Sequence, residues 1–172
     1  MPVVSKQDPT NVLNCDAERQ LELAQLLSPY DIKIKSIADG HPIPGSFFGK
    51  REAGIIGQIL YLRYDTPVHS ALHEASHYIC MDPIRRDKLD TNAEGDFDEE
   101  NGVCYLQILL SDHLNGIGKH RMMLDMDRWG YTFRLGSARA WFEQDAEDAK
   151  QWLQHYSLID AEQQITRQLR HF

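Results

Sequence analysis

Apolar residues recur with helical spacing in several separate segments of the chain. Between residues 17 and 27 the leucines fall on one broad face, and Ser28-Pro29 follows as a stop signal. A second helix is predicted to run to about Cys80, with Thr66 as its N-cap and Pro67 at its first helical position. The same spacing predicts further helices at about residues 99–114, 119–129 and 137–156, and a last one beginning at Asp160.

Three segments of the chain are predicted to be strands. Residues 32–37 alternate apolar and polar side chains, which predicts an edge strand with one buried face, and residues 59–64 have strand composition. Residues 131–135 predict a further short strand. The long connections at 39–57, rich in glycine and proline, and at 81–98 are expected to border a functional site.

These elements predict a single α+β domain over residues 1–172. A small mixed sheet is expected to pack against the helix that ends near Cys80 and against several further helices. Residues 1–12 are polar and interrupted by prolines, so we expect a loose N-terminal arm.

Composition and charge exclude some classes of protein. The 172 residues are 42% hydrophobic and 26% charged, which is typical of a folded globular protein. Their 18 Lys and Arg residues against 26 Asp and Glu residues make nucleic acid a poor default partner. The apolar runs are too short for a membrane span of roughly 20 residues. Three cysteines, an odd number, and a start without a secretory signal predict a cytoplasmic protein.

Residues 73–77 read His-Glu-Ala-Ser-His, an HExxH pattern within a predicted helix. Histidines four positions apart lie on one helix face, so both imidazoles can reach one metal ion. We therefore predict His73 and His77 as metal ligands, and Glu74 as the catalytic base that takes a proton from water on the metal. The alternative is a solvated helix face that carries no chemistry.

A catalytic site with two histidines needs a third protein ligand. Carboxylates cluster around the start of the next predicted helix, at Glu94, Asp96, Asp98, Glu99 and Glu100. We expect Glu100 to be the ligand, because it begins an apolar helix that must pack in the core and would hold the carboxylate rigidly. Glu99 is the alternative, since Gly102 three positions later would also allow close helix approach.

The HExxH pattern with a glutamate on the next helix resembles the gluzincin pattern of the zincin metalloproteins. More narrowly, residues 71–78, followed by Arg85-Arg86 and by Glu100 before an apolar helix, resemble the elongation factor P hydroxylase family over about residues 57–110. That family carries an HExSH core followed by an aromatic residue, an Arg-Arg pair and an acidic segment. The resemblance implies that His73, His77 and Glu100 are metal ligands and that the reaction is iron-dependent insertion of oxygen into a protein side chain.

The same ligands support two kinds of enzyme. Zinc with Glu74 as base would hydrolyse an amide bond in a peptide or protein substrate, and a strand edge within residues 58–64 could hold that substrate. Two histidines and one carboxylate also suit non-haem iron, which would hydroxylate. We expect a zinc metallopeptidase-like hydrolase first, with an iron-dependent hydroxylase as the alternative. An inactive metal-binding module on the same scaffold is the remaining interpretation.

Some polar side chains are candidates for supporting roles. A donor to a developing oxyanion could be His120, Tyr131 or Arg134. The free N–H of a ligand histidine could bond to Asp82 or Asp98.

Other residues near the motif carry less specific expectations. His69, one turn before His73, is either a surface residue or a group that orients substrate. Cys80 and Cys104 are expected to be small packing residues. Asp125-Met126-Asp127 lacks the further oxygens of a calcium loop.

Overall fold

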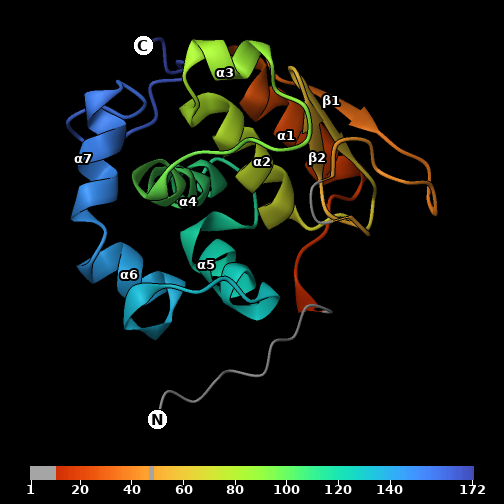
Figure 1. Cartoon of the computed structure of the whole chain (residues 1–172). Helices are drawn as coiled ribbons and strands as arrows, with labels where there is room; N and C mark the ends of the chain where they lie inside the picture. Colours follow the sequence, from red (N-terminus) through yellow and green to blue (C-terminus); the bar gives the residue numbers. More distant parts are fainter. Residues whose placement is uncertain (1–10, 47–48) are drawn as a thin grey trace.

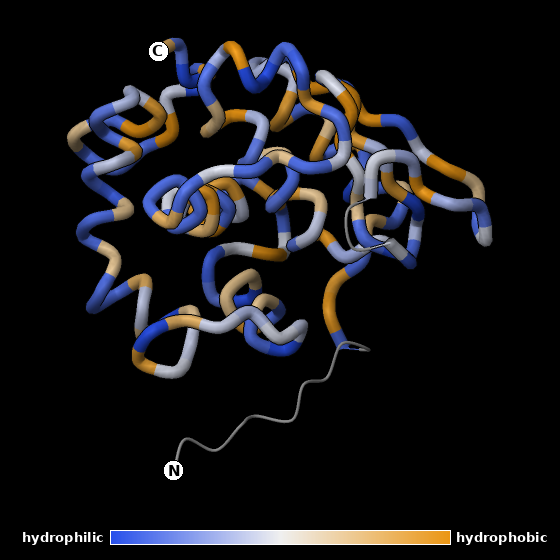
Figure 2. Tube along the Cα trace, viewed as in Figure 1, coloured by the Kyte–Doolittle hydropathy of each residue, from blue (hydrophilic) through white to orange (hydrophobic). Residues whose placement is uncertain are grey.

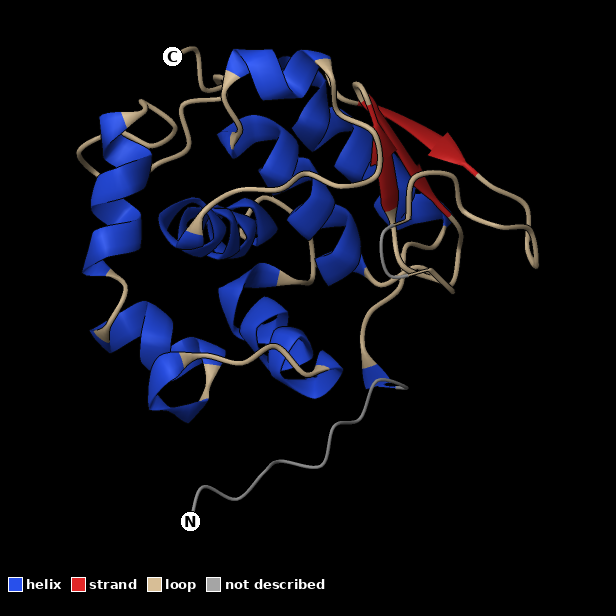
Figure 3. Cartoon of the chain, in the orientation of Figure 1, coloured by secondary structure: helices blue, strands red, loops and turns tan. Residues whose placement is uncertain are grey.

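A small sheet forms one side of the molecule and helices form the rest (Figures 1 and 3). The computed structural model describes residues 11–46 and 49–172. Its helices are α1 (Ala17–Leu27), α2 (Val68–Cys80), α3 (Pro83–Asp87), α4 (Phe97–Ser111), α5 (Gly118–Trp129), α6 (Ala138–Gln144) and α7 (Glu147–His155), with the 3-10 turns η2 (Ser28–Tyr30) and η3 (Arg134–Gly136). Its strands are β1 (Lys33–Ser36), β2 (Gly54–Ile56) and β3 (Ile59–Leu62). None of these helices is both long and apolar enough to cross a membrane.

The described residues therefore have an α+β architecture, as predicted, and the sheet is mixed. Strand β3 lies in the centre, parallel to β1 and antiparallel to β2, with Leu60 and Leu62 fully buried. Strand β1 is an edge strand as predicted, but it half-buries only Ile34, so the expected buried face is narrow. Strand β2 lies in a segment predicted to be a loop. Because β3 is paired on both sides, the expectation that residues 58–64 hold an extended substrate is wrong.

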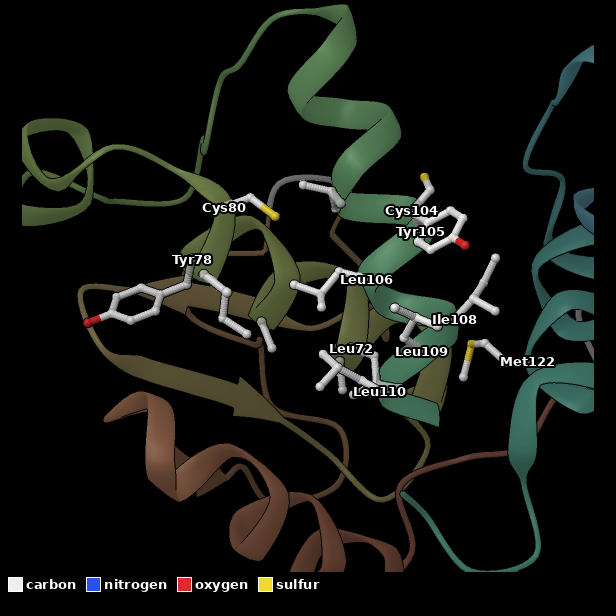
Figure 4. Close-up of a cluster of buried hydrophobic side chains, with 14 of the residues drawn as sticks. Leu72, Tyr78, Cys80, Cys104, Tyr105, Leu106, Ile108, Leu109, Leu110 and Met122 are labelled. Carbon is white, nitrogen blue, oxygen red and sulfur yellow. The ribbon is translucent and has the colours of Figure 1, made fainter. Parts of the chain in front are cut away.

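The core forms where α2 crosses α4 (Figure 4). Leu72 and Cys80 of α2 and Leu106 and Leu110 of α4 are fully buried there, and Met122 of α5 closes the cluster from another side. Each fully buried leucine contributes roughly 1.5–3 kcal/mol to stability. This packing sets the relative position of the two helices.

Helix α4 is buried on all its sides. From Gly102 to Ser111 every residue is buried, and α4 packs against α2, α5 and α7 (Figures 1 and 2). A Cβ at Gly102 would come within 2.6 Å of the Trp152 ring of α7, so glycine allows the close approach of these helices. A helix that is apolar all round belongs in a core. Three neighbours therefore fix both its position and its rotation.

Helix α2 begins one residue later than expected. Pro67, not Thr66, is the N-cap residue, and no side chain caps this end. The Thr66 hydroxyl instead accepts a hydrogen bond from the backbone N–H of Arg63 (2.9 Å) and closes the turn before the helix.

Arg86 of α3, a helix within the segment predicted to be a connection, closes the other end of α2. Its guanidinium donates to the carbonyl oxygens of Tyr78 (2.9 Å) and Met81 (2.6 Å), at a helix end that lacks intrahelical donors. A further bond reaches the carbonyl oxygen of Arg170 (2.7 Å). Arg86 is only 9% exposed and joins α2, α3 and the C-terminal segment.

Residues 131–135 do not form a strand, contrary to the prediction. Gly130 ends α5 at φ 109, and the backbone N–H of Tyr131 bonds back into the last turn of that helix. The rings of Tyr131 and Phe133 stack with their centroids 6.3 Å apart. Side chains two positions apart therefore lie on the same side of the chain, as they do in a strand, but no described strand pairs with this segment. The chain then continues into η3.

The C-terminal third departs from prediction at two further places. The helix expected over 137–156 is divided into α6 and α7, because Asp145 leaves the helical region at φ −142 and its carboxylate pairs with Arg134 (2.8 Å). The helix expected from Asp160 does not form. The Asp160 carboxylate accepts hydrogen bonds from two backbone N–H groups within the next four residues and closes a turn instead.

The expected N-terminal arm covers residues 1–12, of which 1–10 lie outside the described residues. Its last two residues are held in place. Val12 is buried, and the carbonyl oxygen of Asn11 accepts hydrogen bonds from Arg121 (3.0 Å) and Arg128 (3.1 Å). The arm prediction is therefore wrong for residues 11 and 12.

Replacing Arg86 with methionine should lower the free energy of unfolding by about 3 kcal/mol, because several carbonyl oxygens would lose their charged donor. Urea denaturation followed by circular dichroism measures the change. Lys88→Met, at an exposed position just after α3, is the matched control and should change stability by less than about 0.5 kcal/mol. An Arg86→Met protein as stable as the wild type would show that these bonds do not stabilise the fold.

Candidate metal centre

Side chains from α2 and α4 converge at the point where these helices face each other. The Nε2 atom of His73 lies 3.2 Å from one carboxylate oxygen of Glu100, and Nε2 of His77 lies 3.2 Å from the other. The two Nε2 atoms are 3.2 Å apart, and the ligand atoms of all three residues lie within 4.8 Å of one another. The fold thus brings together the three residues that the sequence predicts as metal ligands.

Local helix geometry explains this convergence. His73 and His77 are one turn apart on the same face of α2. The Asp96 carboxylate accepts the backbone N–H of Glu99 (2.9 Å) and caps α4, which places Glu100 in the first turn. The helix dipole stabilises a carboxylate at that position.

Glu99, the alternative third ligand, serves a different purpose. Its buried carboxylate pairs with Arg85 (2.6 Å) and with Arg170 (3.1 Å). Successive helical residues point about 100° apart, so Glu99 and Glu100 face different neighbours. The expectation that Glu99 could be the ligand is therefore wrong for this structure.

Gln107, buried on α4, orients the imidazole of His73. Its amide nitrogen donates to the carbonyl oxygen of His69 (3.0 Å), which turns its amide oxygen toward Nδ1 of His73 (2.9 Å). An amide oxygen only accepts hydrogen bonds, so this network assigns a proton to Nδ1 and leaves Nε2 as the atom that can hold either a second proton or a metal ion. Gln107 was not among the predicted site residues, although a single amide within the apolar run 102–110 was the available signal.

A divalent cation fits this set of donors. Two imidazole nitrogens 3.2 Å apart repel each other unless a proton or a cation lies between them. Burial would lower the pKa of His73, but Tyr131, Cys104 and Glu100 raise that pKa well above its ordinary value. Burial would raise the pKa of Glu100, but hydrogen bonds from both histidines hold it well below its ordinary value. A metal ion would compete with protons for these same atoms.

Glu74 lies beside this centre on α2. Burial raises the pKa of its carboxyl group, against the opposing effect of His73 and His77. A carboxyl group with a raised pKa can exchange a proton closer to neutral pH than an exposed glutamate can. Its position is compatible with the proton-transfer role expected from the sequence.

A cavity of about 470 Å³, which we call the aromatic cavity, lies against one side of the centre. Besides His73, Glu74 and Glu100, its lining includes four rings and one further carboxylate, from Phe97, Trp129, Tyr131, Phe133 and Glu52. Glu52 accepts a 2.6 Å hydrogen bond from the Trp129 indole, and burial raises the pKa of its carboxyl group.

A second cavity, of about 240 Å³, borders the same centre and is called here the polar cavity. All three candidate ligands and Glu74 line it, together with residues 91–95, which we call the wall segment. Both long connections therefore contribute to the site, as expected, the first through Glu52 and the second through the wall segment. Glu52 and Trp129 had no local sequence signal, since their contact joins positions 77 residues apart.

Of the three expected oxyanion donors, Tyr131 lines the aromatic cavity. Arg134 pairs with Asp145, and His120 is exposed on α5. The Tyr131 hydroxyl lies 3.2 Å from Nδ1 of His69, and burial raises its pKa to about 12. Tyr131 therefore stays protonated at neutral pH and can donate a hydrogen bond.

The other polar candidates have structural partners. His69 is only 1% exposed, packs against Trp129 with ring centroids 4.9 Å apart and ring planes tilted by 57°, and has a pKa lowered by burial to about 3. Asp82 caps α3 and Asp98 is exposed, so Gln107 takes the role that was expected of them.

Cys80 and Cys104 are both buried in the core, and Cys104 also lines the aromatic cavity. Asp125 pairs with Arg121 (2.8 Å), and Asp127 accepts the first backbone N–H of α6 (2.8 Å). These two carboxylates therefore bind protein groups.

Comparisons of the chain with protein-family models, curated proteins and solved structures found no match. The geometry of the site is therefore the basis for assigning its function.

Replacing Gln107 with leucine should weaken the binding of a divalent metal by about 10- to 100-fold, because His73 loses the acceptor that orients it. Titration calorimetry with cobalt(II) measures the affinity. Gln107→Glu keeps an oxygen at the same position and should retain most of the affinity. Equal affinities for the leucine variant and the wild type would contradict the orienting role.

Proposed function

We propose that this protein is a mononuclear metal enzyme that modifies one side chain of a protein substrate. His73, His77 and Glu100 would hold the metal, on a zincin-like arrangement of the HExxH helix and the next long helix. One observation carries the proposal: these three residues converge beside a cavity large enough for a side chain.

Two metals suit this donor set. Two histidines and one carboxylate with open positions are typical of non-haem iron enzymes and also of catalytic zinc sites. When bound, iron would supply oxygen activation, whereas zinc would polarise a carbonyl group and activate water. The choice between these chemistries depends on how the substrate reaches the centre.

Within residues 11–46 and 49–172, the sheet offers no open strand edge beside the centre. Strand β3 is paired on both sides, and β1 lies beyond it. Residues 89–91 cover the outer edge of β2, where the backbone N–H of Thr91 donates to the carbonyl oxygen of Ile55 (3.1 Å). A peptidase that holds its substrate as an added strand needs a free edge. This favours hydroxylation of an inserted side chain, in agreement with the resemblance to the elongation factor P hydroxylase family.

The charge of the aromatic cavity favours a cationic side chain. Glu52, Glu74 and Glu100 line it with the rings of Trp129 and Tyr131, and no Lys or Arg among the described residues lines it. Carboxylates and aromatic faces both attract ammonium and guanidinium groups. An arriving cation would also favour the charged form of Glu52 and Glu74, whose pKa burial raises.

Residues of the chain itself would position the substrate and move protons. Glu74 would accept or return a proton beside the bound side chain, and Tyr131 would donate a hydrogen bond to an oxygen of the substrate. Gln107 would keep the Nε2 lone pair of His73 directed at the metal.

Zinc-dependent hydrolysis of an amide bond is the second candidate, and the position of Glu74 favours it. Its buried carboxyl group, next to His73 in an HExxH motif, matches the general base of metallopeptidases. An amide carried on a side chain could enter the aromatic cavity, although an extended backbone has no strand edge to bind.

Metal analysis and product analysis together test the proposal. Protein purified without oxygen or chelator should contain about one iron per chain by mass spectrometry, and His77→Ala should contain none. About one zinc per chain would instead favour hydrolysis. Wild-type protein without either metal would overturn the proposal.

The product distinguishes the same two reactions. Given dioxygen and a two-electron reductant, lysine-containing peptides should gain one oxygen atom by mass while the other oxygen atom leaves as water, whereas hydrolysis would cleave an amide bond. Glu74→Gln should keep the metal and the fold but lose about 100-fold or more in kcat. Glu18→Gln, at an exposed position on α1, is the control. Full turnover by Glu74→Gln would contradict its proton-transfer role.

Glu52→Gln should weaken the preference of the aromatic cavity for a cation. A peptide with a central lysine is compared with the same peptide carrying norleucine, and binding is followed by tryptophan fluorescence because Trp129 lines the cavity. The wild type should bind the lysine peptide more tightly than the norleucine peptide. Because the variant lacks one charged contact, the ratio of the two affinities should fall by about tenfold. Equal binding of both peptides to the wild type would contradict a cationic substrate.

A further inference from the structure

The candidate metal centre borders two cavities of different chemistry. The aromatic cavity includes His73 and Glu100 in its lining, whereas the polar cavity includes all three candidate ligands. The wall segment adds Glu94 and small or polar residues to the polar cavity, without any aromatic ring. A metal held by the three ligands would therefore border both cavities, which share His73, Glu74 and Glu100 and differ in the rest of their lining.

The polar cavity is too small and too acidic for most ligands. Its volume of about 240 Å³ is below the roughly 300 Å³ at which sites for drug-sized ligands begin. Glu74, Glu94 and Glu100 border it, and no Lys or Arg of the described residues does. This charge disfavours anions. An uncharged molecule of a few atoms fits both the size and the charge.

The wall segment is held in place by its neighbours. Its first backbone N–H donates to a carbonyl oxygen of β2, and the carbonyl oxygen of Ala93 accepts from Arg85 (3.0 Å). Gly95, at φ +123, lies so close to Glu99 that a Cβ there would collide with the carboxylate. The same Arg85 pairs with Glu99, so one ion-pair network supports the whole segment.

We propose that the polar cavity is the route by which a small uncharged reactant, of the size of dioxygen or water, reaches the metal. The substrate side chain would fill the aromatic cavity and close that side of the centre. A second opening is then needed for ligand exchange at the metal during turnover. This inference rests on the proposed function for the presence of the metal, but not on which of the two reactions follows.

Nitric oxide is the probe that tests this route, because it is uncharged and similar in size to dioxygen. Its association with the iron(II)-loaded protein, saturated with the lysine peptide so that the aromatic cavity is filled, is followed by absorbance in a stopped-flow instrument. Ala93→Phe places a ring in the wall of the polar cavity and should slow association by about tenfold or more. Thr132→Trp, in the lining of the aromatic cavity, should change the rate by less than about twofold.

A matched control separates obstruction from general disturbance of the wall segment. Ile84→Phe adds a ring in the surface hollow on the other side of Ala93, where Ile84 is 71% exposed, and should leave the rate unchanged. Iron content and thermal unfolding are measured for every variant. If Ala93→Phe fails to fold, Asn92→Phe replaces it, since Asn92 is exposed and lines the same cavity.

The outcomes distinguish this inference from the proposed function. Slower association in the polar-cavity variant alone supports the route. Equal rates in all iron-loaded variants, or slowing only by Thr132→Trp, overturn the route and leave the proposed function standing. Wild-type protein that binds no iron(II) overturns both.

Discussion

The packing of α2 against α4 is the constraint on which the candidate metal centre depends. One helix supplies His73 and His77, the other supplies Glu100, and the buried leucines between them set the distance that the three donors must span. Gathering two largely buried imidazoles beside a carboxylate is unfavourable without a compensating charge. The core therefore holds together groups that repel or compete for protons on their own, and a cation is the natural compensation.

Acidic groups near the centre are divided between two environments. Glu52, Glu74 and Glu100 line the aromatic cavity without a lysine or arginine of the described residues in that lining, whereas Glu99 is paired with Arg85 and Arg170. The arginines near the start of α4 are thus used for structure, and negative charge accumulates where metal and substrate would bind. One pattern of ion pairs therefore has three effects. It leaves negative charge at the proposed metal centre and at the proposed site of a cationic side chain, and it holds the wall segment in place.

Much of the centre could be predicted from local sequence, because its ligands lie one helical turn apart or at the start of an apolar helix. The HExxH spacing and the position of Glu100 needed only helical geometry. Gln107 could not be assigned a role, since its function depends on which helix faces α4. The contact between Glu52 and Trp129 depends on tertiary folding and could not be predicted locally. The aromatic residues Tyr131 and Phe133, two positions apart, led to the prediction of a strand, but this segment pairs with no described strand. The proposed reaction would depend on which metal binds, and two histidines with one carboxylate suit both zinc and iron.

The burial of α4 on every side has a consequence for which carboxylate faces the two histidines. Glu99 and Glu100 are adjacent, and a rotation of α4 by about 100° would exchange them. Such a rotation is blocked by contacts on other faces of the helix, including the close packing of Gly102 on Trp152 of α7. The carboxylate that α4 offers to a metal is therefore selected by packing residues that do not belong to the candidate ligand set. A substitution that loosened this packing would alter the ligand set without replacing any ligand.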